Sequence, residues 1–190
     1  MEFQEFKKIP RLSRDMVITE KIDGTNGQIL IINQQTFEEY HEGYSGDSVE
    51  EFLNKCRLYQ KDNLYIFAGS KSRWLDTSSK GDNYGFAKWV QAHAEELLQL
   101  GEGRHYGEWM GQGIQRNYGL KEKRFYLFNA KKWVENATPP LQDEKQSYCP
   151  NCCHVVPILY NGTFDTQMIQ KQLDILAENG SVAITGFMKP

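Results

Sequence analysis

The chain has 190 residues, 39% hydrophobic, 13% aromatic and 25% charged, with a formal net charge of −3. This length favours one compact domain with a full core, and the aromatic content excludes an intrinsically disordered protein. The charge excludes a uniformly basic surface, so any contact with nucleic acid would depend on local clusters of basic residues.

Neither a membrane span nor a secretory signal is visible in the sequence. No apolar run reaches the ~18 residues that a transmembrane helix needs, and the first residues, MEFQEFKKIPRLSRD, lack a signal-peptide core. The four cysteines do not resemble a secreted disulfide framework. We therefore expect a cytoplasmic protein without membrane contact, whose first residues pack as an irregular segment leading into the first strand.

The first predicted element is a strand, turn and strand in the sequence VITEKIDGTNGQILII, residues 17–32. Two β-branched, apolar runs, Val17–Thr19 and Gln28–Ile32, flank a polar turn that contains Lys21. Side chains alternate along a strand, so we expect Lys21 to leave the first strand at a mouth lined by glycines.

A lysine in this position is a candidate nucleophile. Attack requires the neutral amine, which desolvation or nearby cations favour. Gly24 and Gly27 would let the backbone approach a bulky ligand, while Thr25 and Asn26 would offer hydroxyl and amide groups to phosphate oxygens. The alternative is a surface hairpin with an exposed lysine, because a four-residue match recurs by chance.

The following residues predict a loop, a helix and a strand. Residues 36–47 are rich in Glu, Gly and Tyr and are expected to form a solvated acidic loop. Ser48 is a candidate cap for a short helix that ends near Cys56, a buried thiol. The apolar run at residues 64–68 predicts a buried strand, and the basic residues Lys71 and Arg73 after it would reach a phosphate or belong to a solvated loop.

The middle of the chain predicts one helix and two strands. Apolar residues between positions 82 and 100 follow a helical stripe, with Asp82 or Asn83 as the cap and His93 as a hydrogen-bonded histidine of the core. Strands are expected around residues 106–109 and 125–129, joined by a glycine-rich loop. Glu108 follows a glycine, where a carboxylate can accept hydrogen bonds from the hydroxyl groups of a sugar.

A basic cluster lies between Arg116 and Lys132. This stretch has six basic residues and one acidic residue, which makes it the best candidate for contact with a phosphate backbone. The alternative is an ordinary charged surface.

The last third of the chain contains three cysteines, a helix and a short strand. Cys149 and Cys152 have the spacing of half a zinc site, but the sequence has no second pair, so we expect a local turn rather than a metal site. Asp165 or Thr166 is expected to cap a helix that buries a stripe including Ile169 and Leu173 and ends at Gly180. Residues 181–185 are expected to begin a strand.

Four motifs in this order resemble the ATP-dependent RNA ligases of the bacteriophage T4 RNA ligase 2 class, within the covalent nucleotidyltransferase superfamily. The motifs are EKIDGTN at residues 20–26, SR at 72–73, YGE at 106–108 and FYLF at 125–128. The resemblance implies an α+β nucleotidyltransferase fold (the adenylation fold of ligases, ATP-grasp-like), with antiparallel sheets, flanking helices and ATP between the sheets. It further implies a single adenylation domain over residues 1–190 and a monomer.

The resemblance also implies a reaction and its residues. Lys21 would attack the α-phosphate of ATP in the presence of Mg²⁺ and carry AMP, which passes to an RNA 5′-phosphate before a 3′-hydroxyl seals a nick or joins single-stranded ends. The remaining implied contacts are Glu20 and Ile22 beside the adenine, Asn26 and Arg73 on phosphate or ribose, Glu108 on the ribose and Phe128 stacked on the base. No residue is implied as a metal ligand.

The resemblance ends before the family's last two motifs. A metal-binding glutamate strand and a strand with paired lysines do not occur after Gly180, so we expect a protein truncated at its C-terminal end or half of a split ligase. The adenylation domain of an ATP-dependent DNA ligase, and a protein that binds nucleotide or RNA ends without chemistry, remain alternatives.

Overall fold

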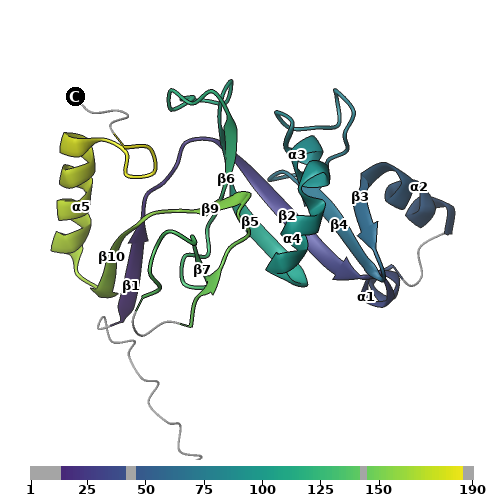
Figure 1. Ribbon diagram of the computed structural model, residues 1–190, viewed down its shortest axis with the longest axis horizontal. Helices are drawn as coiled ribbons and strands as arrows, with labels where there is room; N and C mark the ends of the chain where they lie inside the picture. The colour runs from purple at the N-terminus through teal and green to yellow at the C-terminus, as the bar shows by residue number, and fades with distance from the viewer. Residues whose placement is uncertain (1–13, 42–45, 142–144, 186–190) are drawn as a thin grey trace, which may run out of the picture. The chain divides into compact units, whose positions relative to one another are not determined.

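The computed structural model describes residues 14–41, 46–141 and 145–185, and these form two compact units (Figure 1). The small unit combines the chain up to Glu20 with the chain from Pro157 on, and the large unit is Lys21–Val156. The two peptide links at Glu20–Lys21 and Val156–Pro157 join them. The expected lead-in segment at residues 1–13 lies outside the described residues.

The small unit has two strands and one helix. The elements are β1 (Asp15–Thr19), β10 (Ile158–Thr163) and α5 (Thr166–Asn179). β1 pairs with β10 in antiparallel fashion, so the predicted first strand is present but does not form a hairpin with the next strand. As predicted, Asp165 caps α5 and Gly180 follows its last residue.

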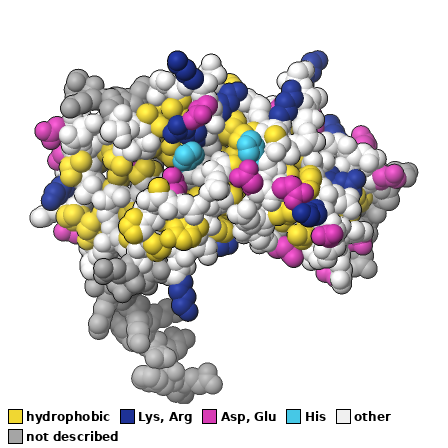
Figure 2. Space-filling model, in the orientation of Figure 1, with side chains coloured by type: hydrophobic (Ala, Val, Ile, Leu, Met, Phe, Trp, Pro, Cys, Tyr) yellow, Lys and Arg dark blue, Asp and Glu magenta, His cyan; other side chains and the backbone are white. Residues whose placement is uncertain are grey.

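Two predictions for the small unit are wrong. The stripe on α5 is not buried, since Ile169 is 36% and Leu173 55% exposed. Hydrophobic side chains are visible at the surface over α5 in Figure 2. Two strands and one helix are too few described elements to enclose such a stripe. Residues 181–185 form turns instead of a strand. The N–H groups of Val182 and Ala183 donate to the Glu20 carboxylate of the same unit, so they do not pair with a neighbouring strand.

The large unit is built on a six-stranded sheet with the order β3-β4-β2-β5-β6-β9. Neighbours are antiparallel except β6 and β9, and a small parallel pair, β7 and β8, lies apart from this sheet. The strands are β2 (Thr25–Asn33), β3 (Arg57–Lys61), β4 (Leu64–Gly69), β5 (Gly103–Gly111), β6 (Lys123–Leu127), β7 (Trp133–Val134), β8 (Ser147–Tyr148) and β9 (Cys153–Val155).

One face of this sheet carries the main core. Ile29 and Ile31 of β2 pack there with Trp109 of β5, Phe125 of β6 and the residues of the covering helices. The covering helices are α3 (Phe86–Ala92), α4 (Ala94–Leu97) and the 3₁₀ turn η1 (Leu98–Leu100) (Figure 1). The predicted helix is therefore divided at His93, whose half-buried ring is hydrogen-bonded to the Trp89 carbonyl (2.9 Å), as expected.

The opposite face is covered at one end by α1 (Gln34–Tyr40) and α2 (Gly46–Cys56). The acidic loop predicted from residue 36 is wrong up to Tyr40, because Asn33 caps α1 through its side chain and Phe37 is buried in a second apolar cluster. Residues 42–45 of that predicted loop lie outside the described residues. The predicted helix ending at Cys56 is confirmed and its thiol is buried, but Ser48 is not its cap, because α2 already begins at Gly46.

Across the described ranges, every helix is too short or too polar to cross a lipid bilayer.

Candidate functional site

The candidate nucleophile lies in the connection that leads into β2. Lys21 is exposed, Ile22 next to it is 3% exposed, and β2 begins at Thr25. The predicted turn is therefore shorter than expected, because residues 25–27 already pair with β5. Lys21 lies four residues before β2 and belongs to the large unit, while Glu20 belongs to the small unit.

Three side chains hold the connection at Asp23 and Gly24. The Asp23 N–H donates to the Tyr118 hydroxyl (2.8 Å), and the Asp23 carboxylate accepts from Arg116 Nε (2.9 Å). The Gly24 N–H donates to Glu108 Oε1 (2.9 Å). The backbone next to Lys21 is thus fixed by residues more than 80 positions away in the sequence.

Gly24 is required at its position for a steric reason. A Cβ atom added there would lie 2.4 Å from the Trp109 carbonyl oxygen and 2.8 Å from Met110 Cβ. The close approach of the connection to β5 therefore depends on the absence of a side chain. The KIDG motif combines an exposed amine with a backbone pressed against the neighbouring strand.

Gly27 serves packing rather than ligand approach, which corrects the expectation from the sequence. It is buried on the core face, and an added Cβ atom would lie 2.8 Å from Phe86 Cζ. Gly107 is directly opposite and is similarly close to Phe125. These two glycines let the aromatic rings of the core reach the sheet.

Glu108 is a buried carboxylate beside the exposed lysine. It is 8% exposed, and burial raises its pKa, while the Gly24 N–H and the positive charge of Lys21 act in the opposite direction. Asn26 is directly opposite Glu108 in the pairing of β2 and β5, and Tyr126 is directly opposite Glu108 in the pairing of β5 and β6. Directly opposed residues share a face, so these three side chains form one row.

A second row lies beside the first on the same face. Gln28 is paired with Tyr106, and the Phe128 N–H donates to the Tyr106 carbonyl oxygen (2.9 Å). Tyr106 is 53% and Phe128 42% exposed. The face away from the main core therefore combines a buried carboxylate, two amide side chains and two exposed aromatic rings.

Two predicted residues have other partners in the structure. The Arg73 guanidinium donates to the carbonyl oxygens of Gly81 and Asp82 and so ties together the loop between β4 and α3. The Glu20 carboxylate is 7% exposed and accepts from the Ser181 hydroxyl (2.6 Å) and the N–H groups of Val182 (2.8 Å) and Ala183 (2.9 Å). The predicted ligand contacts of Arg73 and Glu20 stay predictions.

The basic cluster at residues 116–132 is largely engaged within the chain. Arg116 binds Asp23, Lys123 Nζ donates to the Tyr84 carbonyl (2.7 Å), and Arg124 pairs with Glu122 (2.5 Å). Lys132 Nζ lies 4.5 Å from the centroid of the Trp133 ring. Exposed pairs of this kind contribute little to stability, so a phosphate could displace them.

The three cysteines near residue 150 lie close together, with Cys149 and Cys153 buried and Cys152 half-buried. Cys149 Sγ approaches the Cys153 carbonyl (3.5 Å), Cys152 and Cys153 have their sulfur atoms 4.0 Å apart, and burial raises the pKa of the Cys149 thiol to about 11. Over the described ranges, no group of three or more His, Cys, Asp or Glu residues is arranged to hold a metal ion. The expectation of a local turn without zinc stays a prediction.

Sequence reasoning did not assign roles to Tyr118, Tyr106 or Gln28, and it counted Arg116 only as a basic residue. A signal was present between the YGE and FYLF motifs, where the stretch GQGIQRNYG contains Arg116 and Tyr118. Left-handed φ angles at Asn117 (61°) and Tyr118 (54°) form the turn that brings these side chains to Asp23. Such a backbone is not readable from residue type alone.

Comparison with known proteins bears on the family to which the chain belongs. The family model described as RNA ligase matches residues 14–185 and so covers most of the chain. Comparisons with curated proteins and with solved structures gave no match. The extent of the family match shows that this chain belongs to the RNA ligase family.

Proposed function

We propose that this chain is an ATP-dependent RNA ligase of the T4 RNA ligase 2 class, with the nucleotidyltransferase fold and with Lys21 as the residue that carries AMP. The observation that carries the proposal is the position of Lys21. It is exposed, it follows the buried Glu20, and it precedes a connection fixed to Glu108 on a sheet face with exposed aromatic rings. The match to the RNA ligase family supports RNA rather than DNA as the polynucleotide.

In the first step, the neutral Nζ of Lys21 attacks the α-phosphorus of ATP. A P–N bond forms, the bond to the leaving oxygen of pyrophosphate breaks, and the amine gives up one proton. Next, a 5′-phosphate oxygen of RNA attacks the same phosphorus, which frees the lysine and joins AMP to the RNA end. Finally, a 3′-hydroxyl attacks the activated 5′-phosphate and AMP leaves.

The residues of the large unit suit the parts of ATP that do not react. The carboxylate of Glu108 can accept hydrogen bonds from ribose hydroxyls, and Asn26 in the same row can donate to phosphate or ribose. Phe128 offers an exposed ring on which a purine can stack. The Ile22 side chain is buried, so we assign its expected contact with adenine to the backbone of this residue.

Mg²⁺ would enter with the phosphates of ATP, whose oxygens are the ligands it prefers. Because the described residues assemble no carboxylate cluster for a metal, the proposal assigns Mg²⁺ no protein ligand and derives no step through it.

The test is transfer of label from α-³²P-ATP to the protein in the presence of magnesium. We expect acid-labile, alkali-stable label on the purified chain, and none on Lys21→Ala. The matched control is Lys88→Ala, an exposed lysine on α3, which should keep full labelling. Label that persists in Lys21→Ala, or a wild-type chain that takes up no label, would contradict the assignment.

A further inference from the structure

A cavity of about 670 Å³ lies on the same sheet face as the two rows described above, beyond Gln28 along β2. Its walls come from α1, α2, β2 and β4, from the loop after β4 that carries Trp74, and from the start of β5 with the residue before it. Leu30 of β2 lines it and is two residues from Gln28, and Arg104 of β5 lines it and is two residues from Tyr106. At ~3.3 Å per residue, the cavity begins about 7 Å from the second row.

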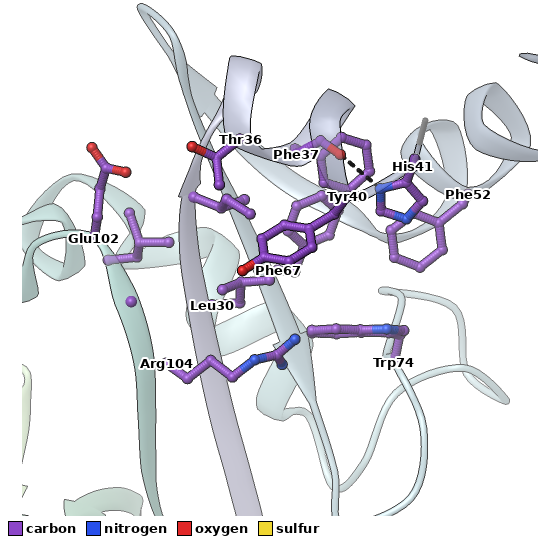
Figure 3. A pocket seen from close by; sticks show the side chains of 13 residues that line it. Leu30, Thr36, Phe37, Tyr40, His41, Phe52, Phe67, Trp74, Glu102 and Arg104 are labelled. Carbon is purple, nitrogen blue, oxygen red and sulfur yellow. Dashed lines mark hydrogen bonds between the residues drawn. The ribbon is translucent and has the colours of Figure 1, made fainter. Parts of the chain in front are cut away.

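The interior of the cavity is lined by packed aromatic rings. Phe37 and Phe67 stack with their ring centroids 5.5 Å apart, and Trp74 packs against Phe67 at 5.8 Å. Phe37 and Phe67 are buried, whereas Tyr40 at the rim is 74% exposed. Figure 3 shows the Trp74 ring edge-on, and the Tyr40 ring lies above it in this view. A flat ring system suits a space with these walls.

One cation lies at the mouth of the cavity. The Arg104 guanidinium is 5.2 Å from the centroid of the Trp74 ring, and its Nη1 donates to Gln28 Oε1 (3.1 Å). Figure 3 shows Arg104 reaching toward Trp74, while Glu102 points away from both. A guanidinium has five N–H donors in a planar fork, which suits a phosphate group. Its bond to Gln28 also connects the cavity with the second row.

A purely apolar ligand would leave Arg104 without a function in binding. An aromatic wall with a guanidinium at its edge is instead the combination that binds single-stranded nucleic acid, in which bases stack and phosphates pair with cations. The cavity continues from the face to which the proposed function assigns the nucleotide. The charge of Arg104 and the continuity of the cavity with that face therefore both favour a single-stranded nucleic acid as the ligand.

We propose that this cavity binds an unpaired nucleobase of the RNA substrate, with the base against Tyr40 and Trp74 and a neighbouring phosphate on Arg104. The inference rests on the proposed function for the identity of the polynucleotide. It adds a site for the RNA strand to the site for ATP.

The test is a fluorescence anisotropy titration of a labelled single-stranded RNA at several salt concentrations. Tyr40→Ala should weaken the affinity about tenfold, because stacking on one aromatic ring is lost, while Tyr40→Phe should keep it. Arg104→Gln should weaken the affinity and also flatten its dependence on salt, since one phosphate contact is lost. Tyr148→Ala on β8, another exposed tyrosine of the large unit, is the matched control and should bind as the wild type does.

Tyr40 and Arg104 are exposed, so their replacement should leave the fold intact, in contrast to replacement of Trp74 in the apolar cluster. Unchanged RNA affinity in both Tyr40→Ala and Arg104→Gln would overturn the proposal. Equal competition by a blunt RNA duplex of the same length would also overturn it, because such a duplex has no unpaired base.

Labelling with ATP alone separates this inference from the proposed function. Tyr40→Ala should take up label on Lys21 at the wild-type rate, because that step requires no RNA. If labelling persists and RNA affinity is unchanged, the cavity proposal fails and the proposed function stands. If the wild-type chain takes up no label, the proposed function fails, and the RNA titration still decides whether the cavity binds a base.

Discussion

At the scale of single residues, the site combines one exposed amine with one buried carboxylate. Lys21 and Glu108 come from distant parts of the chain, and Gly24 links them because its N–H binds Glu108 while its missing side chain permits close contact with β5. The positive charge of Lys21 favours ionisation of Glu108, against the effect of burial. The charge of Lys21 therefore acts on the Glu108 carboxylate before any ligand is present.

The raised pKa of Glu108 predicts a dependence of stability on pH. The folded chain holds the Glu108 proton more tightly than the unfolded chain does, so the free energy of unfolding should fall as pH rises from the ordinary value of 4.5 through the folded pKa. The Glu108→Gln variant has no ionisable group at this position, so its free energy of unfolding should not show this fall. Urea unfolding between pH 4 and pH 7 should show the wild type losing stability relative to the variant as pH rises.

The matched control for this comparison is Glu178→Gln, at an exposed position of α5. A stability difference between wild type and Glu108→Gln that stays constant over the pH range would contradict the prediction.

At the scale of elements, the loop before α3 shows how a helix start can hold a site in place. The Asp82 carboxylate accepts from the N–H groups of Asn83 and Ala87 (both 2.7 Å), and the Asn83 side chain donates to Thr25 Oγ1 (3.1 Å) at the start of β2. Arg73 binds the Asp82 carbonyl (3.0 Å). The predicted cap at Asp82 or Asn83 is wrong as to position, because α3 begins at Phe86 and Gly85 is its N-cap, but the Asp82 carboxylate still accepts from the Ala87 N–H of the first turn.

This arrangement predicts that Asp82→Ala destabilises the chain by about 1 kcal/mol, the usual cost of removing a capping side chain. Asp82→Asn keeps an oxygen acceptor and should lose less. The measurement is the midpoint of urea unfolding at unchanged m-value. An alanine variant as stable as the wild type would show that the carboxylate does not stabilise α3.

At the scale of the whole molecule, the two units of the described chain differ in how far their side chains are buried. The large unit has a main core with Phe86, Trp109 and Phe125 fully or almost fully buried, whereas no residue of α5 in the small unit is buried. The division falls between Glu20 and Lys21, inside the motif that carries the proposed chemistry.

The difference in burial predicts different rates of amide hydrogen exchange. Local opening costs little where few apolar side chains are buried, so the amides of α5 should exchange orders of magnitude faster than those in the centre of β2. Exchange measured by mass spectrometry on peptic peptides tests this, with a peptide from β5 as the internal reference for slow exchange. Protection of α5 equal to that of β2 would contradict the prediction.

Local sequence determined the elements whose signals lie within a few residues. Asp165 and Gly180 bound α5 because a capping oxygen and a glycine act on the adjacent turn. The apolar run at residues 64–68 became β4, and the order of four short motifs indicated the RNA ligase family, which the family match confirms.

Tertiary structure decided everything that depends on which distant segments pair. The row of Asn26, Glu108 and Tyr126, the packing role of Gly27, and the connection from Arg116 and Tyr118 to Asp23 all follow from the register of β2, β5 and β6. The exposed stripe on α5 likewise reflects which elements surround it. Periodicity reports that a face is apolar, but burial depends on long-range packing, so local sequence could not distinguish a covered stripe from an open one.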